Sequence, residues 1–478
     1  MRVLQLHWAF PPTIGGVETH LVLLGKGLVR KGLEVSLLTG TASDADMIED
    51  YHWEGMRIRR TPLMDLNHLT PESIRAKEDA IRREIHNFVE ETRPQIIHAH
   101  NMHYFSPLHT KILVEIKERL GIPLILTAHN VWEDETAEEM LQFASAWDGI
   151  ICVSDYIRRE MEKAGYPKDR LRVVYHGIDT ERFAPATPEE KKAIRNQYPE
   201  LEGKKIIFHP ARMGKAKGCH VSVRALDLVR RQFPTAVLAM AGSGNIVDWC
   251  RHQPKEIKEI TDLINELNLR DHVFIKLFSW DEMPQFYKIC DVCIYPSINQ
   301  EPFGLVMLEA MASGKPLVVT YSGGMPEVVK DGYNGFVVGR SDHRELADRI
   351  IQILSDSQLA GRLVENGLRS VHQNYNWNLM VNNTITAYER FLEASRARRE
   401  EKRKEKLAKK VARKEAVLRP VAAEPGMARV AINPSIAPAG APEVRVSGVR
   451  APAEPTGSAG AELRAAGMGG AGAAQEEA

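Results

Sequence analysis

Two glutamates stand close together in an apolar stretch of the chain. Residues 301–320 have the sequence EPFGLVMLEAMASGKPLVVT, in which Glu301 and Glu309 are eight positions apart. A buried carboxylate without a partner is costly, so each should accept hydrogen bonds. We expect Glu301 to meet hydroxyls of a sugar and Glu309, at most about two helical turns further on, to meet the vicinal hydroxyls of a ribose. Two exposed glutamates would fit poorly with the apolar VML and AMA around Glu309.

A basic loop in the middle of the chain offers a partner for phosphate groups. The segment HPARMGKAKG, residues 209–218, directly follows an apolar run that predicts a strand. Arg212 and Lys217 in this loop could together neutralise a diphosphate that departs as a leaving group. The alternative is a solvated basic loop, which is the interpretation we favour for Lys215.

Two segments could present backbone amides to the same phosphates. The amides of Phe303, Gly304 and Leu305 begin the predicted helix VMLEAMASG, where the helix dipole favours an anion. Gly15 and Gly16 follow the first predicted strand and precede a helix, so they could act in the same way. A tight strand-to-helix turn explains the two glycines equally well, because the G-x-G-x-x-G fingerprint is absent.

Histidines gather after predicted strands of the first half. His98, His100 and His103 form HAHNMH after the apolar QII. We expect them to line the cleft from the first half, and we favour this polar lining over metal ligation because no acidic partner is apparent nearby. Further residues assigned by position to the same wall are His7, Trp8 and Glu18.

The elements that must position these residues form two α/β halves. Short apolar runs alternate with amphipathic stretches, which is typical of βαβ units and parallel sheets. Ligands of such sheets bind beyond the carboxyl ends of the strands. We expect two doubly wound Rossmann-like domains facing a cleft. The expected segments are a first domain at 1–185, a second domain at 200–371, a helix packing back across both at 372–394, a basic helical extension at 395–419 and a disordered Ala/Pro/Gly-rich tail at 420–478.

Composition narrows the class of protein. The 478 residues contain 63 basic and 63 acidic side chains, so no global charge calls for nucleic acid. Five cysteines fit a reducing cytoplasm better than a disulfide framework. Cys290 and Cys293 have metal-site spacing but lie in an apolar run, so we expect buried free thiols. No apolar run approaches the length of a membrane span.

The segment from Arg396 to Arg419 is locally basic, with twelve basic and four acidic residues. A solvated helix explains this composition. The alternative is peripheral contact with an anionic membrane at its inner face, to which each basic residue adds roughly 1 kcal/mol.

The motifs together resemble a known family. GGVE, TAHN, ARMGKAKG, EPFGLVMLEAMASGKPLVV and SGGMPEVV occur in the order found in family 4 of the retaining glycosyltransferases, which have the GT-B fold. The resemblance covers roughly residues 1–392. One departure is Ala211-Arg212, where the family usually has Gly-Arg, and it keeps both cations of the loop.

The resemblance implies a role for each matching residue. Arg212 and Lys217 would bind the donor diphosphate, Glu309 the ribose, and Glu301 the transferred sugar. His129, in LILTAHN, would lie beside the reacting sugar, although its residue type alone is a weak signal. Base recognition is expected from backbone groups near Leu277 and Phe278 and from the turn 242–244. The expected donor-binding residues are Gly15, Gly16, Arg212, Lys217, Gly244, Phe278, Glu301, Phe303, Gly304, Leu305 and Glu309. The expected catalytic residues are His129, Arg212, Lys217 and Glu301, and those on the acceptor side are His7, Glu18, His100 and His103.

The implied activity is transfer of a sugar from a nucleotide diphosphate donor to the hydroxyl of a sugar or lipid-linked acceptor. It would retain the anomeric configuration and need no metal or other cofactor, and it would serve synthesis of a surface polysaccharide, lipopolysaccharide or glycolipid. Two alternatives stay open. A nucleotide-sugar epimerase could use the same fold, and a non-catalytic protein could bind the donor without reacting.

Overall fold

The computed structural model describes residues 1–13, 15–41, 47–241 and 253–418. Gly244, expected to bind the donor, and the expected disordered tail at 420–478 lie outside these residues.

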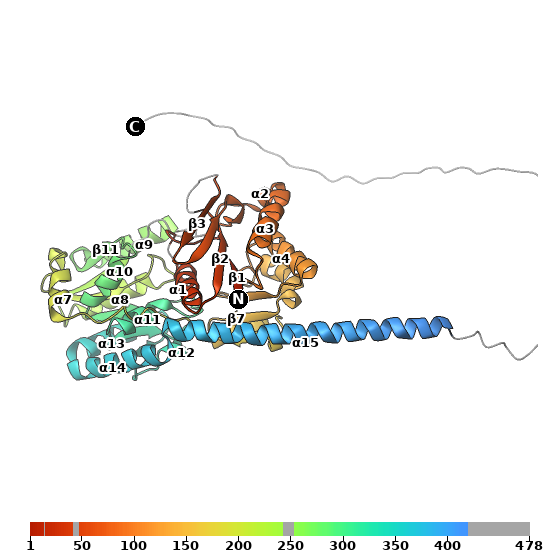
Figure 1. The fold of residues 1–478 in the computed structure, drawn as a ribbon. Coiled ribbons are helices and arrows are strands. Elements are labelled where there is room, and N and C mark those ends of the chain that lie inside the picture. Colours follow the sequence, from red (N-terminus) through yellow and green to blue (C-terminus); the bar gives the residue numbers. More distant parts are fainter. Residues whose placement is uncertain (14, 42–46, 242–252, 419–478) are drawn as a thin grey trace, which may run out of the picture. The chain divides into compact units, whose positions relative to one another are not determined.

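A parallel sheet organises the first part of the chain, β1 to β8, which we call the first lobe (Figure 1). Its strand order is β3-β4-β2-β1-β5-β6-β7-β8, and only β3 pairs in the antiparallel sense. The strands are β1 (Arg2–Leu6), β2 (Glu34–Thr39), β3 (Glu49–Trp53), β4 (Met56–Arg60), β5 (Ile96–His100), β6 (Leu124–Ala128), β7 (Gly149–Cys152) and β8 (Leu171–Val173).

The hairpin of β3 and β4 is absent from the strands expected from sequence. EDYHW and MRIRR are largely polar, so neither has the apolar run that marked the other strands. Their turn is formed by Glu54 and Gly55, both with positive φ, as a two-residue hairpin turn requires.

A second parallel sheet begins after α7, and α7 to α14 form what we call the second lobe. Its strand order is β11-β10-β9-β12-β13-β14, with every pairing parallel. The strands are β9 (Lys205–His209), β10 (Ala236–Ala241), β11 (Val273–Lys276), β12 (Val292–Tyr295), β13 (Leu317–Thr320) and β14 (Phe336–Val338). The predicted fold class, two doubly wound sheets, is confirmed.

Helices connect the strands of both sheets. In the first lobe they are α1 (Gly16–Arg30), α2 (Pro71–Ala76), α3 (Glu78–Thr92), α4 (Pro107–Leu120), α5 (Glu135–Met140) and α6 (Asp155–Lys163). The later ones are α7 (Pro188–Arg195), α8 (Cys219–Val229), α9 (Gln253–Glu266), α10 (Glu282–Ile289), α11 (Leu305–Ala312), α12 (Met325–Val328), α13 (His343–Ser355), α14 (Ser357–Asn374) and α15 (Trp377–Leu418). Short 3-10 turns lie at Pro62–Met64, Leu141–Ala146, Lys168–Arg170, Pro199–Leu201 and Arg270–His272.

The expected helix at 372–394 is divided between two helices. Residues 372–374 end α14, and α15 begins at Trp377. The helical path is interrupted between the two helices. Here the amide of Ile178 donates to the carbonyl of Tyr375, and the amide of Trp377 donates to the carbonyl of Ile178. This bridge ties the connection between the lobes to the start of α15.

The long helix α15 packs on the first lobe through buried aromatic residues. Tyr388 is fully buried, and its hydroxyl lies 2.6 Å from Nδ1 of His98 in β5. Phe391 covers Gly149, where a Cβ atom would come within about 2.1 Å of the ring. Further along, Ser395 Oγ donates to Asp148 Oδ1 at 2.8 Å, so the anchored part of the helix reaches at least this residue.

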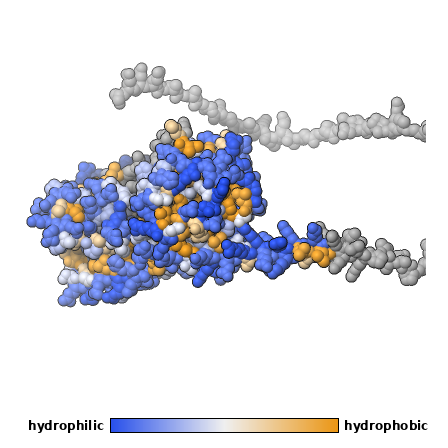
Figure 2. Space-filling view, in the orientation of Figure 1, coloured by the Kyte–Doolittle hydropathy of each residue, from blue (hydrophilic) through white to orange (hydrophobic). Residues whose placement is uncertain are grey.

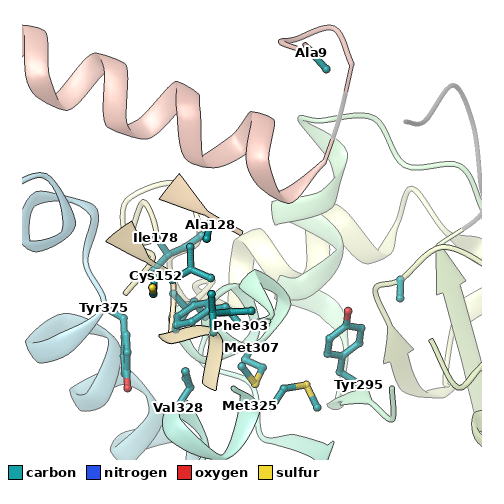
Figure 3. Close-up of a cluster of buried hydrophobic side chains, with 14 of the residues drawn as sticks. Ala9, Ala128, Cys152, Ile178, Tyr295, Phe303, Met307, Met325, Val328 and Tyr375 are labelled. Carbon is teal, nitrogen blue, oxygen red and sulfur yellow. The ribbon is translucent and has the colours of Figure 1, made fainter. Parts of the chain in front are cut away.

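A shared apolar cluster and a few hydrogen bonds join the two lobes. Figure 3 shows Phe303 between Ala128 and Ile178 on one side and Met307 and Met325 on the other. The carboxylate of Glu327 accepts hydrogen bonds from the first amides of α6 at 2.6 and 2.7 Å. An acid at this position also complements the helix dipole.

The structure bears on two further expectations, the lack of a membrane-spanning segment and the free state of the cysteines. Within the described ranges, no helix is both long and apolar enough to cross a membrane. The described cysteines Cys152, Cys219, Cys290 and Cys293 are free and buried. The prediction of buried free thiols for the last two is confirmed, and their sulfurs lie 3.4 Å apart, within hydrogen-bond distance and without a disulfide.

Candidate functional site

The second-lobe part of the site is built around an ion pair. Lys217 lies in the loop after β9, and its Nζ is 2.6 Å from Glu301 Oε1. The same oxygen accepts from Ser297 Oγ at 2.8 Å, while Tyr295 OH lies 3.2 Å from Lys217 Nζ. Burial acts to lower the pKa of Lys217, but Tyr295 and Glu301 raise it above its usual value. The lysine therefore stays protonated and supplies the partner that buried Glu301 needs.

Glycines allow the loops of this site to approach one another. Gly218 has a φ of +77°, and a Cβ there would lie 1.9 Å from the carbonyl oxygen of Pro296. Gly323 has a φ of +52°, and its Cβ would lie 2.0 Å from the carbonyl oxygen of Glu301. That same carbonyl accepts from the amide of Gly324 at 2.8 Å. The SGG segment thus fixes the backbone that carries Glu301.

Glu309 finds its partner within the protein. The hydroxyl of Tyr287 donates to Glu309 Oε2 at 2.7 Å, and the half-buried carboxylate has its pKa raised by burial. The hydrogen bond from Tyr287 and the charge of Arg182 act in the opposite direction. No sequence pattern pointed to Tyr287, which lies in α10 and reaches Glu309 only after folding.

The start of α11 faces the first glycine turn. Gly304, with a φ of +90°, is the residue before the first turn of α11. A Cβ on Gly16 would lie 3.9 Å from Leu305 Cδ1, an ordinary contact between the two lobes. The structure therefore places Gly16 beside the side chain of Leu305, the first residue of α11.

A close contact with a buried side chain also explains why residue 15 is a glycine. A Cβ there would lie 2.2 Å from Glu18 Oε2, so a glycine leaves room for this buried carboxylate. Glu18 Oε1 in turn lies 3.1 Å from His7 Nε2. The turn interpretation and the phosphate interpretation of the two glycines are compatible in this geometry.

His129 belongs to a buried cluster of imidazoles at the carboxyl edge of the first sheet. Its Nε2 lies 3.1 Å from His100 Nδ1, and its ring stacks 5.3 Å from that of His176. The ring of His176 meets Phe303 of the second lobe at 5.1 Å. This chain of contacts brings the cluster to the EPFGL loop. His20 completes the cluster, with Nδ1 2.9 Å from His176 Nδ1.

Burial controls the charge of these rings. It holds the pKa of His20, His100 and His129 well below the usual range, and neighbouring histidines push it further down. Burial also lowers the pKa of His176 to about 3. All four rings are therefore neutral at pH 7 and carry one proton each, so each has one donor and one acceptor nitrogen.

The three histidines of HAHNMH have different hydrogen-bond partners in the structure. His98 uses both ring nitrogens, at 2.6 Å from Tyr388 OH and 2.7 Å from Thr127 Oγ1. His103 Nε2 lies 2.9 Å from the carbonyl of Asn130. Of the three, His100 lies within hydrogen-bond distance of His129, and the ring of His98 packs beside that of His100 with centroids 4.2 Å apart. The expectation of one common wall for these side chains is thus refined: His98 is tied to α15, and His103 to the loop after β6.

Of the other expected residues, two pack against aromatic side chains and one lies in the loop of Lys217. The ring of Phe278 packs against Phe208 and Phe286, with centroids 5.8 and 4.6 Å away, so its side chain belongs to the core. Trp8 packs against Phe105 at 3.8 Å and is buried. Arg212 is half-buried in the loop of Lys217. Its carbonyl accepts a weak hydrogen bond from Cys219 Sγ at 3.6 Å.

Sequence reasoning missed several residues that complete the site. Asn101 has a φ of +53°, and its Oδ1 accepts the amide of His129 at 2.8 Å. The repeated His-Asn of HAHN and TAHN is the signal that could have found it. His20 and His176 gave no comparable signal, because their segments, GVETHL and VVYHG, are distant from each other in the chain.

Each lobe matches a family model of glycosyltransferases. A family model described as Glycosyltransferase Family 4 matches residues 14–182, and one described as Glycosyl transferases group 1 matches residues 190–370. An uncharacterised glycosyltransferase of Methanocaldococcus jannaschii is 28% identical over 405 residues, which are 81% of this chain and 98% of the relative. A glycogen synthase of Mycobacterium tuberculosis is 25% identical over 422 residues, covering 81% and 94%.

Solved structures share the fold. HepE of Anabaena, crystallised with UDP and glucose, superposes with a TM-score of 0.66 at 20% identity and covers 81% of this chain and 99% of its own. A glycosyltransferase of Rickettsia africae superposes with a TM-score of 0.65 at 22% identity, covering 82% and 98%. At this level of identity the likeness establishes the architecture of two facing Rossmann-like domains.

Proposed function

Because the chain belongs to glycosyltransferase family 4 with its GT-B fold, we propose that it moves a sugar from a nucleotide diphosphate sugar to an acceptor hydroxyl with retention of the anomeric configuration. The observation that carries this proposal is that the expected donor-binding segments of the second lobe contact the glycine turn and the histidine cluster of the first lobe. The first turn of α11 contacts Gly16, and the EPFGL loop contacts His176 beside His129. Cations, amides, carboxylates and imidazoles thus surround one reaction centre.

The diphosphate occupies the second-lobe side in this proposal. Arg212, Lys217 and the amides at the start of α11 stabilise the negative charge that grows on the departing diphosphate. Those groups need no metal to do so. Glu309 accepts hydroxyls of the ribose with the oxygen that Tyr287 leaves open. Backbone groups near Leu277, whose side chain is 58% exposed, contact the base.

The reacting sugar lies between Glu301 and His129. The bond between its anomeric carbon and the diphosphate oxygen breaks while the acceptor oxygen bonds to the same face of that carbon. The acceptor proton passes to the departing diphosphate, so no enzyme carboxylate acts as nucleophile. His129, held through its amide by Asn101, is positioned to contact the sugar hydroxyls.

A loss-of-function experiment tests this assignment. We expect the combined substitutions Arg212→Ala and Lys217→Ala to lower the transfer rate at least about a hundredfold, as loss of leaving-group stabilisation does. A screen of UDP-, GDP- and ADP-sugars by thermal shift first selects the donor, since binding stabilises the folded chain. Turnover that survives both changes would show the assignment to be wrong.

Product analysis distinguishes the remaining functions. A new glycoside shows transfer, whereas an altered nucleotide sugar shows epimerisation, and donor binding without turnover shows a sensor. The relatives matched over most of this chain include a glycogen synthase and other glycosyltransferases, which supports transfer. The acceptor is proposed to be a sugar or lipid-linked sugar that enters from the first-lobe side.

A further inference from the structure

Three histidines of the first lobe form a nearly equilateral group. The centroid of the His20 ring lies 5.6 Å from that of His100 and 5.1 Å from that of His129, and the third separation is 5.4 Å. Each ring also offers one nitrogen such that the three atoms lie within 4.8 Å of one another. All three side chains are buried. Such convergence of three imidazoles is unusual for residues that serve only as polar lining.

The spacing of the nitrogens matches that of a zinc site. Zinc–imidazole bonds measure about 2.0–2.1 Å, so two ligand nitrogens in a tetrahedral site are about 3.4 Å apart. His100 Nδ1 and His129 Nε2 are 3.1 Å apart, which is within a few tenths of an ångström of that value. A bound ion would replace the hydrogen bond between these two rings, and each ring would turn so that its nitrogen lone pair points at the ion.

The rings are held in place by their surroundings. His20 lies in α1, His100 ends β5, and His129 follows β6, so regular elements carry all three. Asn101 holds the backbone of His129, and His176 Nδ1 lies 2.9 Å from His20 Nδ1. His20 thus has a second hydrogen-bond partner, as ligating histidines usually do, whereas His100 Nε2 and His129 Nδ1 have none among the described residues.

We propose that His20, His100 and His129 together bind one divalent ion of the imidazole-preferring class, represented by Zn²⁺. Three neutral nitrogens leave a fourth coordination position for water. Zinc would act as an inhibitor and not as a cofactor, because it would occupy the ring of His129. This consequence rests on the proposed function, in which His129 contacts the reacting sugar. The binding site itself does not depend on it.

The alternative is a network of neutral imidazoles that hydrogen-bond to each other. In that network His100 and His129 share one proton between facing nitrogens. The other nitrogens, His100 Nε2 and His129 Nδ1, are buried and have no hydrogen-bond partner among the described residues. A network of this kind has no reason to bind zinc in a one-to-one ratio, so metal titration separates the two explanations.

The experiment titrates the metal-free full-length chain with Zn²⁺ in competition with a chromophoric indicator. We expect one tightly bound ion per chain, with affinity at least tenfold weaker in His20→Gln and in His100→Gln. His52→Ala is the matched control, because His52 is exposed in β3 and outside the cluster. Circular dichroism verifies that each variant is folded. Equal zinc affinity in the unmodified chain and both Gln variants would overturn the site.

Cobalt provides a readout that needs no variant. Co²⁺ bound by three imidazoles in a tetrahedral site should give visible absorption bands in the unmodified protein, and Zn²⁺ should abolish them. Absence of those bands at saturating Co²⁺ would also overturn the site, while continued sugar transfer would leave the proposed function intact. Transfer assays with and without Zn²⁺ test the inhibition. A rate unchanged in the zinc-loaded protein would overturn that consequence.

Discussion

Lys217 Nζ and Glu301 Oε1 lie 2.6 Å apart although the two residues are 84 positions apart in the chain. Glu301 is buried, with 8% of its side chain exposed, against 28% for Lys217. Removal of one member of such a pair leaves a buried charge, which costs about 3 kcal/mol. We therefore expect Lys217→Met to lower the free energy of unfolding by about that amount in urea denaturation.

A neighbouring lysine serves as the control for this substitution. Lys215 pairs with Glu259, and both side chains are more than one third exposed. Its replacement by Met should cost less than about 1 kcal/mol, as exposed ion pairs do. The double variant Lys217→Met/Glu301→Gln should lose less stability than the sum of the two single changes. Equal losses at the two lysines would contradict a buried pair.

Gly323 packs closely against the backbone of Glu301. Gly323→Ala adds the strain of a positive φ, and its Cβ would lie 2.0 Å from the carbonyl oxygen of Glu301. Gly332 has a φ of +70° with open space around it, so Gly332→Ala adds strain alone. We expect thermal unfolding to show a loss of about 1–2 kcal/mol at Gly332 and roughly 2 kcal/mol more at Gly323. A similar loss at both glycines would rule out the clash.

The architecture could be predicted because each buried strand is a short apolar run in the sequence. KIIFH, VCIY and LVVT are short apolar runs of the kind that predicts a buried strand, and they form β9, β12 and β13. Their loops carry the basic residues and the EPFGL motif, so the sequence also located the second-lobe part of the site. The hairpin of β3 and β4 was missed because a polar edge strand has no such run.

The pairing of side chains could not be predicted. Buried carboxylates require partners, yet the sequence does not say whether the partner is a ligand or the protein. In the structure Lys217 and Tyr287 supply partners that we had expected from sugar hydroxyls. His20 and His176 meet only because α1 and the loop after β8 reach the same sheet edge. Such contacts arise from tertiary packing between distant segments.

Glu309 should make stability depend on pH in an unusual direction. Burial raises the pKa of its carboxyl group in the folded chain, against the lowering effects of Tyr287 and Arg182. The folded state then binds the proton more tightly than the unfolded state, whose carboxyl pKa is about 4.3. The stabilisation is present below that pH and is lost as the pH rises through the raised pKa of the folded state.

Denaturation at several pH values tests this dependence. The free energy of unfolding of the wild type minus that of Glu309→Gln should fall as the pH rises above about 4.3. The same difference for Glu393→Gln, at an exposed position of α15, should stay nearly constant. A difference for Glu309 that grows with pH would mean that the folded state favours the carboxylate.

The exposed part of α15 should bind anionic membranes. Every residue from 400 to 411 is exposed, and Figure 2 shows a hydrophilic surface with an apolar patch along this helix. Leu407 and Val411, one helical turn apart, are 62% and 47% exposed. Basic residues beside an exposed apolar pair suit the surface of an anionic bilayer, each basic residue adding roughly 1 kcal/mol.

The anchoring contacts determine how this prediction is tested. Arg398 donates to the carbonyl of Asp148 and Arg399 to that of Gly121, so truncation before these residues would also loosen α15. The better variant keeps the chain to its end and changes to Gln only the basic residues Lys402, Arg403, Lys404, Lys406, Lys409 and Lys410. We expect the unmodified chain to co-sediment with phosphatidylglycerol vesicles at low salt and the variant to remain in the supernatant. Neutral phosphatidylcholine vesicles should retain neither, and equal sedimentation of both proteins with the anionic vesicles would exclude the helix as the membrane contact.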